Sequence, residues 1–209
     1  MTSPGSSAPA LPDARATIDE AARTIALSSG LTAITLRRMA SVSSLSPGVI
    51  AAEEPSMHAL AARTFSDLAL SELGRIREVA AAASTPLEAL RILVSALLAT
   101  DHSLSKTIWA DAWSIGRHND FVAVAARECM TTWQELAVSI LDAGNASGDF
   151  HVTNAPLAAR QFFALIDSTT VYGLVGYLTE EERSQLVTRS VEVSVGLAEG
   201  TLAGGSVEG

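Results

Sequence analysis

Apolar residues recur along most of this chain at intervals of three and four, which is the spacing of one face of an α-helix. The first run follows Asp13, a favoured N-cap, and stops at Gly30, a favoured residue at helix ends. Its apolar positions are Ile18, Ala21, Ala22, Ile25 and Ala26. Two shorter patterns follow, with Thr35 and Ser46 placed to cap them. We therefore expect three helices within residues 13–55, the last two joined by a serine-rich turn.

The same spacing continues beyond residue 55 as a succession of longer helices. Ser56 restarts the chain, and one apolar stripe then extends to about Ala83, where Ser84-Thr85-Pro86 ends it. The valine, isoleucine and threonine residues are not arranged in alternating strand patterns. Later helical patterns are expected at residues 87–98, 104–115, 122–140, 157–178 and 180–199. The sequence predicts an all-α fold, in which a three-helix helix-turn-helix unit is joined by a long helix to a C-terminal helical bundle.

The formal net charge of −9 is unevenly distributed along the chain. Five acidic and five basic residues fall between Met1 and Arg63, so this part is neutral and the remainder carries the whole −9. Because an acidic surface repels the phosphates of DNA, any nucleic-acid contact must come from the N-terminal unit. We therefore expect that residues 13–55 form the helix-turn-helix domain that would carry any DNA contact, and that residues 56–199 form a separate acidic helical domain.

Composition also limits the compartment and the chemistry. The single cysteine, Cys129, allows no internal disulfide and no cysteine-based metal site, which suits a reducing cytoplasm. Residues 1–12 lack the basic and apolar regions of a signal peptide and, like residues 200–209, are expected to form a disordered tail. No apolar stretch reaches the ~20 residues of a membrane span. Since the sequence has no paired metal ligands, phosphate-binding loop or nucleophile elbow, we expect no enzyme, no metal site and no cofactor.

A set of residues between Ile18 and Leu60 stands at the spacing of a known DNA-binding motif. The set consists of Ile18, Ala21, Ala22, Gly30, Thr35, Arg37, Met39, Ala40, Leu45, Ser46, Gly48, Ile50, Ser56 and Leu60. In these residues the chain resembles the tetracycline-repressor (TetR) family of bacterial regulators. That family's first helix reads Ile-x-x-Ala-Ala, its second Thr-x-Arg-x-Ile-Ala, and its recognition helix Val-Ser-x-Gly-x-Leu. The spacing fits without a gap, and the resemblance in architecture covers nearly the full length.

The resemblance implies that the second and third helices contact operator DNA. The residues at DNA-facing positions are Thr35, Arg37, Arg38, Ser46, Pro47, Gly48 and Ala52. None of the last four can make a bidentate contact with a base. The family's phosphate-binding tyrosine and lysine are replaced by Ala51 and Met57, and the carboxylates of Glu53 and Glu54 lie between them. We therefore expect weaker operator binding than in a typical relative, although Glu53 and Glu54 could also form a solvated turn.

Large apolar side chains gather on successive C-terminal helices, where the resemblance implies a cavity for a small effector. The candidate effector-binding residues are Trp109, Asp111, Trp113, Met130, Trp133, Phe162, Phe163, Ile166 and Asp167. Any one of the apolar residues could equally be ordinary core. Asp111 and Asp167 are carboxylates in apolar surroundings, and each could bind a cationic or hydroxylated effector or serve as a hydrogen-bonded structural group.

The helix at residues 157–178 carries only two charges, Arg160 and Asp167, so we expect it to pair with a second copy together with the last helix. The resemblance implies an effector-responsive transcriptional regulator, expected to be a homodimeric repressor. Its small, largely apolar effector would tilt the long helix at residues 56–83 and release operator DNA. An alternative is a ligand-binding or protein-interaction dimer of the same fold that has lost operator binding.

Overall fold

The computed structural model describes residues 13–99 and 103–202, and regular structure in these ranges is entirely helical. In chain order the elements are α1 (Ala14–Ser29), the 3-10 helix η1 (Leu31–Ala33), α2 (Leu36–Ser43), α3 (Pro47–Glu53), α4 (Met57–Ala81), α5 (Pro86–Leu98), α6 (Ser103–Ile115), α7 (Asp120–Ser147), α8 (Ala155–Leu174) and α9 (Glu180–Val195). The all-α prediction is confirmed. None of the helices in this part of the chain is long and apolar enough to cross a membrane.

The helices begin where the sequence provides capping side chains. Thr35 Oγ1 accepts a hydrogen bond from Arg38 N at 3.4 Å, and Ser46 Oγ accepts one from Val49 N at 3.3 Å. These bonds satisfy amide groups that a helix leaves without an internal partner at its N-terminus. The N-cap residues that accept in this way are Asp13, Thr35, Ser46, Ser56, Thr85, Asn119, Asn154 and Thr179.

The turn between α2 and α3 brings these two helices together over one small core. Ser44 has a φ of 59°, in the left-handed region, which reverses the chain after α2. Ser43 Oγ donates to Met39 O at 2.7 Å and accepts from Leu45 N at 3.2 Å, so the turn is internally hydrogen-bonded. Beneath it, apolar side chains from four helices are fully buried, namely Ile18, Ala22, Met39, Ile50 and Leu60.

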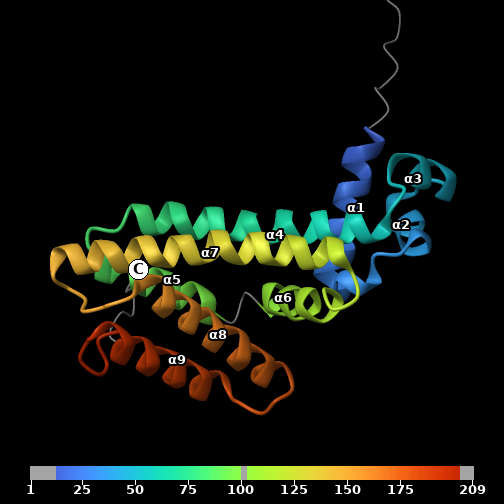
Figure 1. The fold of residues 1–209 in the computed structure, drawn as a ribbon. Coiled ribbons are helices and arrows are strands. Elements are labelled where there is room, and N and C mark those ends of the chain that lie inside the picture. Colours follow the sequence, from blue (N-terminus) through green and yellow to red (C-terminus); the bar gives the residue numbers. More distant parts are fainter. Residues whose placement is uncertain (1–12, 100–102, 203–209) are drawn as a thin grey trace, which may run out of the picture.

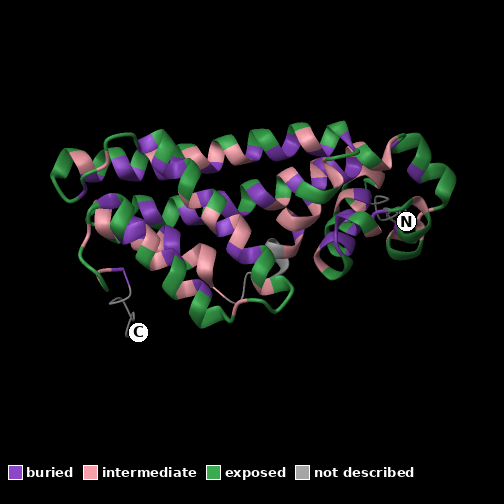
Figure 2. Cartoon of the chain, turned by 60° about the horizontal axis from the view of Figure 1, so that its bottom comes forward, coloured by how far each residue is buried: buried purple, intermediate pink, exposed green. Residues whose placement is uncertain are grey.

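The two longest helices, α4 and α7, lie side by side along the length of the molecule (Figure 1). At one end α4 continues into the unit formed by α1, α2 and α3, and α6 lies beside the same end. At the other end α5 packs on α4 and α7, α8 packs on α7, and α9 packs on α8 and α5. In Figure 2 the buried positions face inwards along these helices and the exposed positions cover the outside, as amphipathic helices require.

The buried side chains form two clusters, and the boundary between them does not coincide with residue 55. The first cluster fills α1–α3 but also includes Ile108 and Ala112 of α6 and Val122 and Cys129 of α7. The second fills the space between the C-terminal half of α4 and α5, α7, α8 and α9. Trp109 of α6 packs against both clusters. The N-terminal unit therefore shares its core with helices of the C-terminal part.

Several segment ends differ from the sequence prediction, and α9 ends at Val195 and not at residue 199. Helix α7 continues through Gly144 to Ser147, and the Phe150 ring packs on Gly144 in the space that a side chain would need. Helix α8 ends at Leu174 and not near residue 178. Leu202, expected to lie in a tail, is buried, and its backbone N–H donates to Glu192 Oε1 at 2.8 Å. The tails expected at residues 1–12 and 203–209 lie outside the described residues.

Candidate functional site

The candidate DNA-contacting residues all lie on the surface of α2, α3 and their N-caps. The exposed set is Thr35, Arg37, Arg38, Ser46, Pro47, Gly48 and Ala52. Because the Thr35 and Ser46 oxygens act as acceptors in the caps, each hydroxyl keeps its hydrogen free to donate to a phosphate. Arg38 Nη2 donates to Ser29 Oγ of α1 at 2.7 Å, which restrains this side chain beside α2. The helix-turn-helix geometry thus leaves these groups accessible on two adjacent helices.

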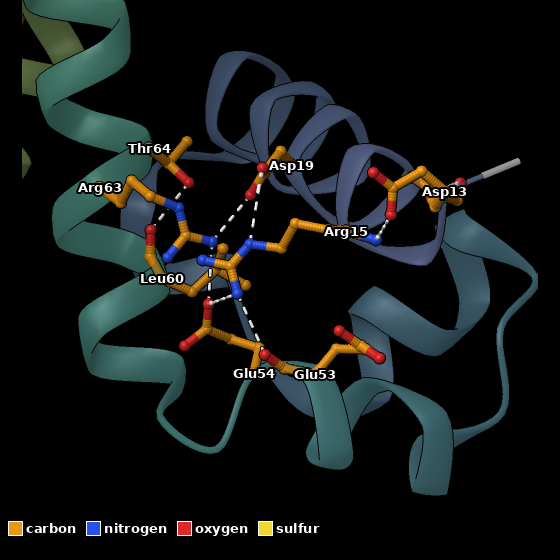
Figure 3. Close-up of polar contacts among 9 residues, drawn as sticks. Asp13, Arg15, Asp19, Glu53, Glu54, Leu60, Arg63 and Thr64 are labelled. Carbon is orange, nitrogen blue, oxygen red and sulfur yellow. Dashed lines mark hydrogen bonds and ion pairs between the residues drawn. The ribbon is translucent and has the colours of Figure 1, made fainter.

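Glu54 does not lie where the sequence placed it, and neither of the two sequence interpretations of this residue holds. Its side chain is 6% exposed, and Oε2 forms ion pairs with Arg63 at 2.8 Å and with Arg15 at 3.2 Å. Figure 3 shows Glu54 pointing towards these arginines and Glu53 pointing away from them. Glu54 therefore neither solvates a turn nor opposes DNA phosphates, and Glu53 is the carboxylate of this pair that faces solvent.

The ion pairs of Glu54 belong to a cluster that ties three helices together. Arg63 Nη2 of α4 also pairs with Asp19 Oδ1 of α1 at 2.7 Å, and Arg15 Nη1 donates to the backbone O of Glu53 at 3.0 Å. Burial lowers the pKa of Arg63, but hydrogen bonds with Asp19 and Glu54 outweigh it, and the net shift is upwards. The cluster (Figure 3) fixes the C-terminal end of α3 against α1 and α4.

A small cavity of about 50 Å³ lies between α4, α5, α6, α7 and α8, and we call it the Asp167 cavity. Its walls contain six of the nine candidate effector-binding residues, namely Trp109, Met130, Trp133, Phe163, Ile166 and Asp167. Sequence analysis missed four further wall residues, Glu72, Ala96, Leu97 and Thr170. Glu72 follows Phe65 by seven residues on the apolar stripe of α4. A carboxylate on an apolar stripe is the sequence signal that could have identified Glu72 as a buried wall residue.

The remaining three candidates lie outside the Asp167 cavity. Phe162 lines a second, larger cavity of about 290 Å³ between α5, α7, α8 and α9, whose walls are mostly apolar. Trp113 is 38% exposed, and its ring lies 5.6 Å from that of Trp109. Asp111 Oδ2 accepts a hydrogen bond from the backbone N–H of Leu31 at 2.8 Å, so this carboxylate caps η1 of the N-terminal unit.

The Asp167 cavity combines aromatic walls with buried polar groups. Trp109 contacts Phe65 edge to face at a centroid distance of 4.9 Å, and Trp133 contacts Phe163 at 6.1 Å. Burial raises the pKa of Asp167 to about 6, although a hydrogen bond from Trp113 opposes the shift. The indole N–H of Trp133 is buried and has no hydrogen-bond partner in the described part of the chain.

Three comparisons with known proteins bear on these sites. Residues 114–196 match the family model of AefR-like transcriptional repressor C-terminal domains. A search of curated protein sequences finds no match. A transcriptional regulator from Saccharomonospora viridis, solved in complex with choline, is 19% identical, has a TM-score of 0.77, and is matched over 87% of this chain and 97% of that chain.

Two further solved structures share the fold. A TetR transcription regulator from Haloarcula marismortui is 16% identical, with a TM-score of 0.76, over 88% of this chain and 100% of that chain. The regulator FadR from Bacillus subtilis, solved in complex with stearoyl-CoA, is 20% identical, with a TM-score of 0.67, over 87% of this chain and 97% of that chain. At these identities the solved structures establish the fold of this chain and not its ligand.

The fold and the C-terminal family match agree with the helix-turn-helix motif read from residues 18–60. The motif accounts for the N-terminal unit, and the family match covers α7, α8 and α9. The described part of this chain has the fold of the solved TetR-family regulators, and its residues 114–196 match the AefR-like repressor C-terminal domain.

Proposed function

We propose that this protein is a repressor that binds operator DNA through α2 and α3 and releases it when a small molecule enters the Asp167 cavity. The observation that carries the proposal is the position of α6. Through Trp109 this helix forms part of the cavity wall, and through Asp111, two residues later, it is hydrogen-bonded to η1 of the N-terminal unit. A displacement of α6 by an effector would therefore act directly on the DNA-binding helices.

The size of the cavity supports this coupling. A volume of about 50 Å³ holds one or two water molecules, at roughly 30 Å³ each in the liquid. An effector with several non-hydrogen atoms must therefore move a wall before it fits. Met130 and Trp109 are half-buried wall residues, and Trp109 also packs against Phe65 of α4. The effector shifts the equilibrium only by as much as it prefers the expanded, DNA-releasing state over the compact one.

The exposed apolar residues of α8 and α9 support a homodimer as part of the proposal. Large apolar side chains lie on the outer surface of these helices and of the turn between them, namely Leu157, Val171, Tyr172, Leu174, Val175, Tyr177, Leu186 and Val193. A two-fold contact would bury them and would place two helix-turn-helix units on successive turns of a pseudo-palindromic operator.

The alternative, a dimer of the same fold that has lost operator binding, rests on Glu53 and on the small residues of α3. Ser46, Pro47, Gly48 and Ala52 offer no bidentate base contact, and Glu53 places one negative charge on the exposed surface. Of the two carboxylates that favoured this alternative, Glu53 and Glu54, the second is buried and paired with Arg63, so it does not face DNA. Operator binding therefore remains the better-supported function.

The test is retention of genomic fragments that include the DNA flanking the gene, at about 50 and 200 mM salt. We expect one fragment to be enriched, with retention that falls steeply with salt. The double variant Arg37→Ala, Arg38→Ala should lose this retention, whereas Arg75→Ala, an exposed arginine on α4, serves as the control for loss of positive charge. Absence of specific retention at the lower salt concentration would refute operator binding.

A further inference from the structure

Asp167 is a buried acid with an unusual set of neighbours. It lies on α8 in the wall of the cavity, with Trp109 from α6 and Met130 and Trp133 from α7 in the same walls. The side chain of Trp113 is its hydrogen-bond partner, and none of the ion pairs among the described side chains includes Asp167. An ionised carboxylate in such surroundings is poorly stabilised unless a cation enters.

Two other charged side chains near this cavity, Arg183 and Glu72, have interaction partners of their own. Arg183 of α9 donates to Leu97 O at 2.9 Å and to Thr170 Oγ1 at 3.3 Å, and it also pairs with Glu180 at 3.6 Å. Glu72 of α4 contributes a second buried carboxylate, which has interactions of its own. Arg183 therefore faces the carbonyl end of α5, and the cavity walls contain two acids and three aromatic rings beside Thr170 and apolar side chains.

Aromatic rings complete a site for a positive charge. Two tryptophans, Trp109 of α6 and Trp133 of α7, lie in the cavity walls with Asp167, and Trp133 packs on Phe163 at 6.1 Å. The face of an indole attracts cations more strongly than any other side-chain ring, and the attraction grows where water is excluded. A purely hydrocarbon effector would bring no counter-charge to Asp167 and would leave the Trp133 N–H without a hydrogen-bond partner.

We propose that the effector is a small organic cation, a substituted ammonium held by the Asp167 carboxylate and the indole rings of Trp109 and Trp133. An oxygen on the same molecule would accept the hydrogen bond of the Trp133 N–H. This inference rests on the proposed function for its choice of cavity, but it concerns binding alone and stands or falls without DNA. It also replaces the largely apolar effector expected from the sequence by one with an apolar body and a positive charge.

The experiment compares charged probes with uncharged analogues of the same shape. Choline and its neutral carbon analogue 3,3-dimethylbutan-1-ol, and benzyltrimethylammonium and neopentylbenzene, are titrated into the full-length protein while tryptophan fluorescence and heat are recorded. We expect at least one ammonium ion to bind about tenfold or more tightly than its analogue. Asp167→Asn should abolish this preference, whereas Asp142→Asn, an exposed acid on α7, should leave it intact.

The pH dependence gives a second readout that general loss of structure would not reproduce. With the pKa of Asp167 at about 6, roughly one carboxyl in eleven is ionised at pH 5, so the ammonium ion should bind about tenfold more weakly at pH 5 than at pH 7.5. The neutral analogue should show no such change. The proposal is overturned if neither ammonium ion is preferred over its analogue, or if the preference survives in Asp167→Asn.

Failure of this inference can be distinguished from failure of the proposed function. If stearate binds the protein and releases operator DNA equally well in the wild-type chain and in Asp167→Asn, the regulator remains and the cationic effector is wrong. If an ammonium ion binds through Asp167 but leaves operator binding unchanged, the effector class is correct and the coupling to DNA is wrong.

Discussion

Glu53 and Glu54 are adjacent acids for which the structure predicts opposite effects of the same substitution. Glu54→Gln removes a charge whose oxygen lies 2.8 Å from Arg63 and 3.2 Å from Arg15. Charge-assisted hydrogen bonds contribute about 1.5–3 kcal/mol each. Because the two arginine side chains are 30% and 40% exposed, solvent screening reduces the expected cost to about 1–2 kcal/mol in total. Glu53→Gln removes the same charge from an exposed position and should change stability by less than about 0.5 kcal/mol.

Urea denaturation of both variants and of the wild-type protein measures the difference in the free energy of unfolding. In thermal unfolding, the midpoint of Glu54→Gln should fall by about 2–4 °C for each kcal/mol lost. Operator affinity at about 50 mM salt measures the effect of each substitution on DNA binding. Glu53→Gln should bind a fewfold more tightly because an anion near the phosphates has gone. Glu54→Gln should bind no more tightly than wild type, since its carboxylate holds α3 against α1 and α4. Equal stability of the two variants would refute the assigned role of the ion-pair cluster.

Two further predictions concern the coupling and the buried acid. Asp111→Ala leaves the Leu31 N–H without its acceptor, so effector binding should lose about 1–3 kcal/mol of its influence on operator affinity. Operator titrations with and without the effector measure this quantity, and an unchanged ratio of the two affinities in the variant would exclude Asp111 as the link. Asp167 has a raised pKa of about 6, so its contribution to stability is fully present below its ordinary pKa near 4 and is lost as the pH rises through about 6. In Asp167→Asn the free energy of unfolding should fall less between pH 4 and pH 7 than in the wild-type chain, by at most about 3 kcal/mol, and parallel profiles would contradict the burial argument.

The helix starts were predictable because capping acts over three residues. Thr35, Ser46 and Thr179 each accept a hydrogen bond from the amide three positions later, so the signal and its partner lie within one turn of sequence. Arg15 and Asp111 carried no comparable signal. The acceptor of Arg15 lies 38 residues away and the donor to Asp111 lies 80 residues away, and only the tertiary fold brings them together.

The cavity was predicted in part for a related reason. Phe162 and Phe163 are neighbours in sequence, and successive helical residues point about 100° apart. The first lines the larger cavity between α5 and α9, and the second lines the Asp167 cavity. Sequence shows that both side chains are large and apolar but cannot determine which neighbouring helix each one faces. Glu72 differs from the two phenylalanines, because the sequence alone places this carboxylate on the buried stripe of α4 and so indicates an unusual buried acid.

The position of α6 relates the two halves of the molecule. Trp109 and Asp111 are two residues apart and therefore project about 200° apart around the helix axis. One lies in the cavity wall and packs against both buried clusters, while the other caps η1 of the N-terminal unit. A small shift of α6 to admit an effector must move both residues, because a helix behaves as a rigid element. The proposed effector site and the proposed DNA-binding unit share α6, whose Trp109 packs against both buried clusters, so no separate relay is needed. The coupling then depends on how firmly Asp111 holds Leu31.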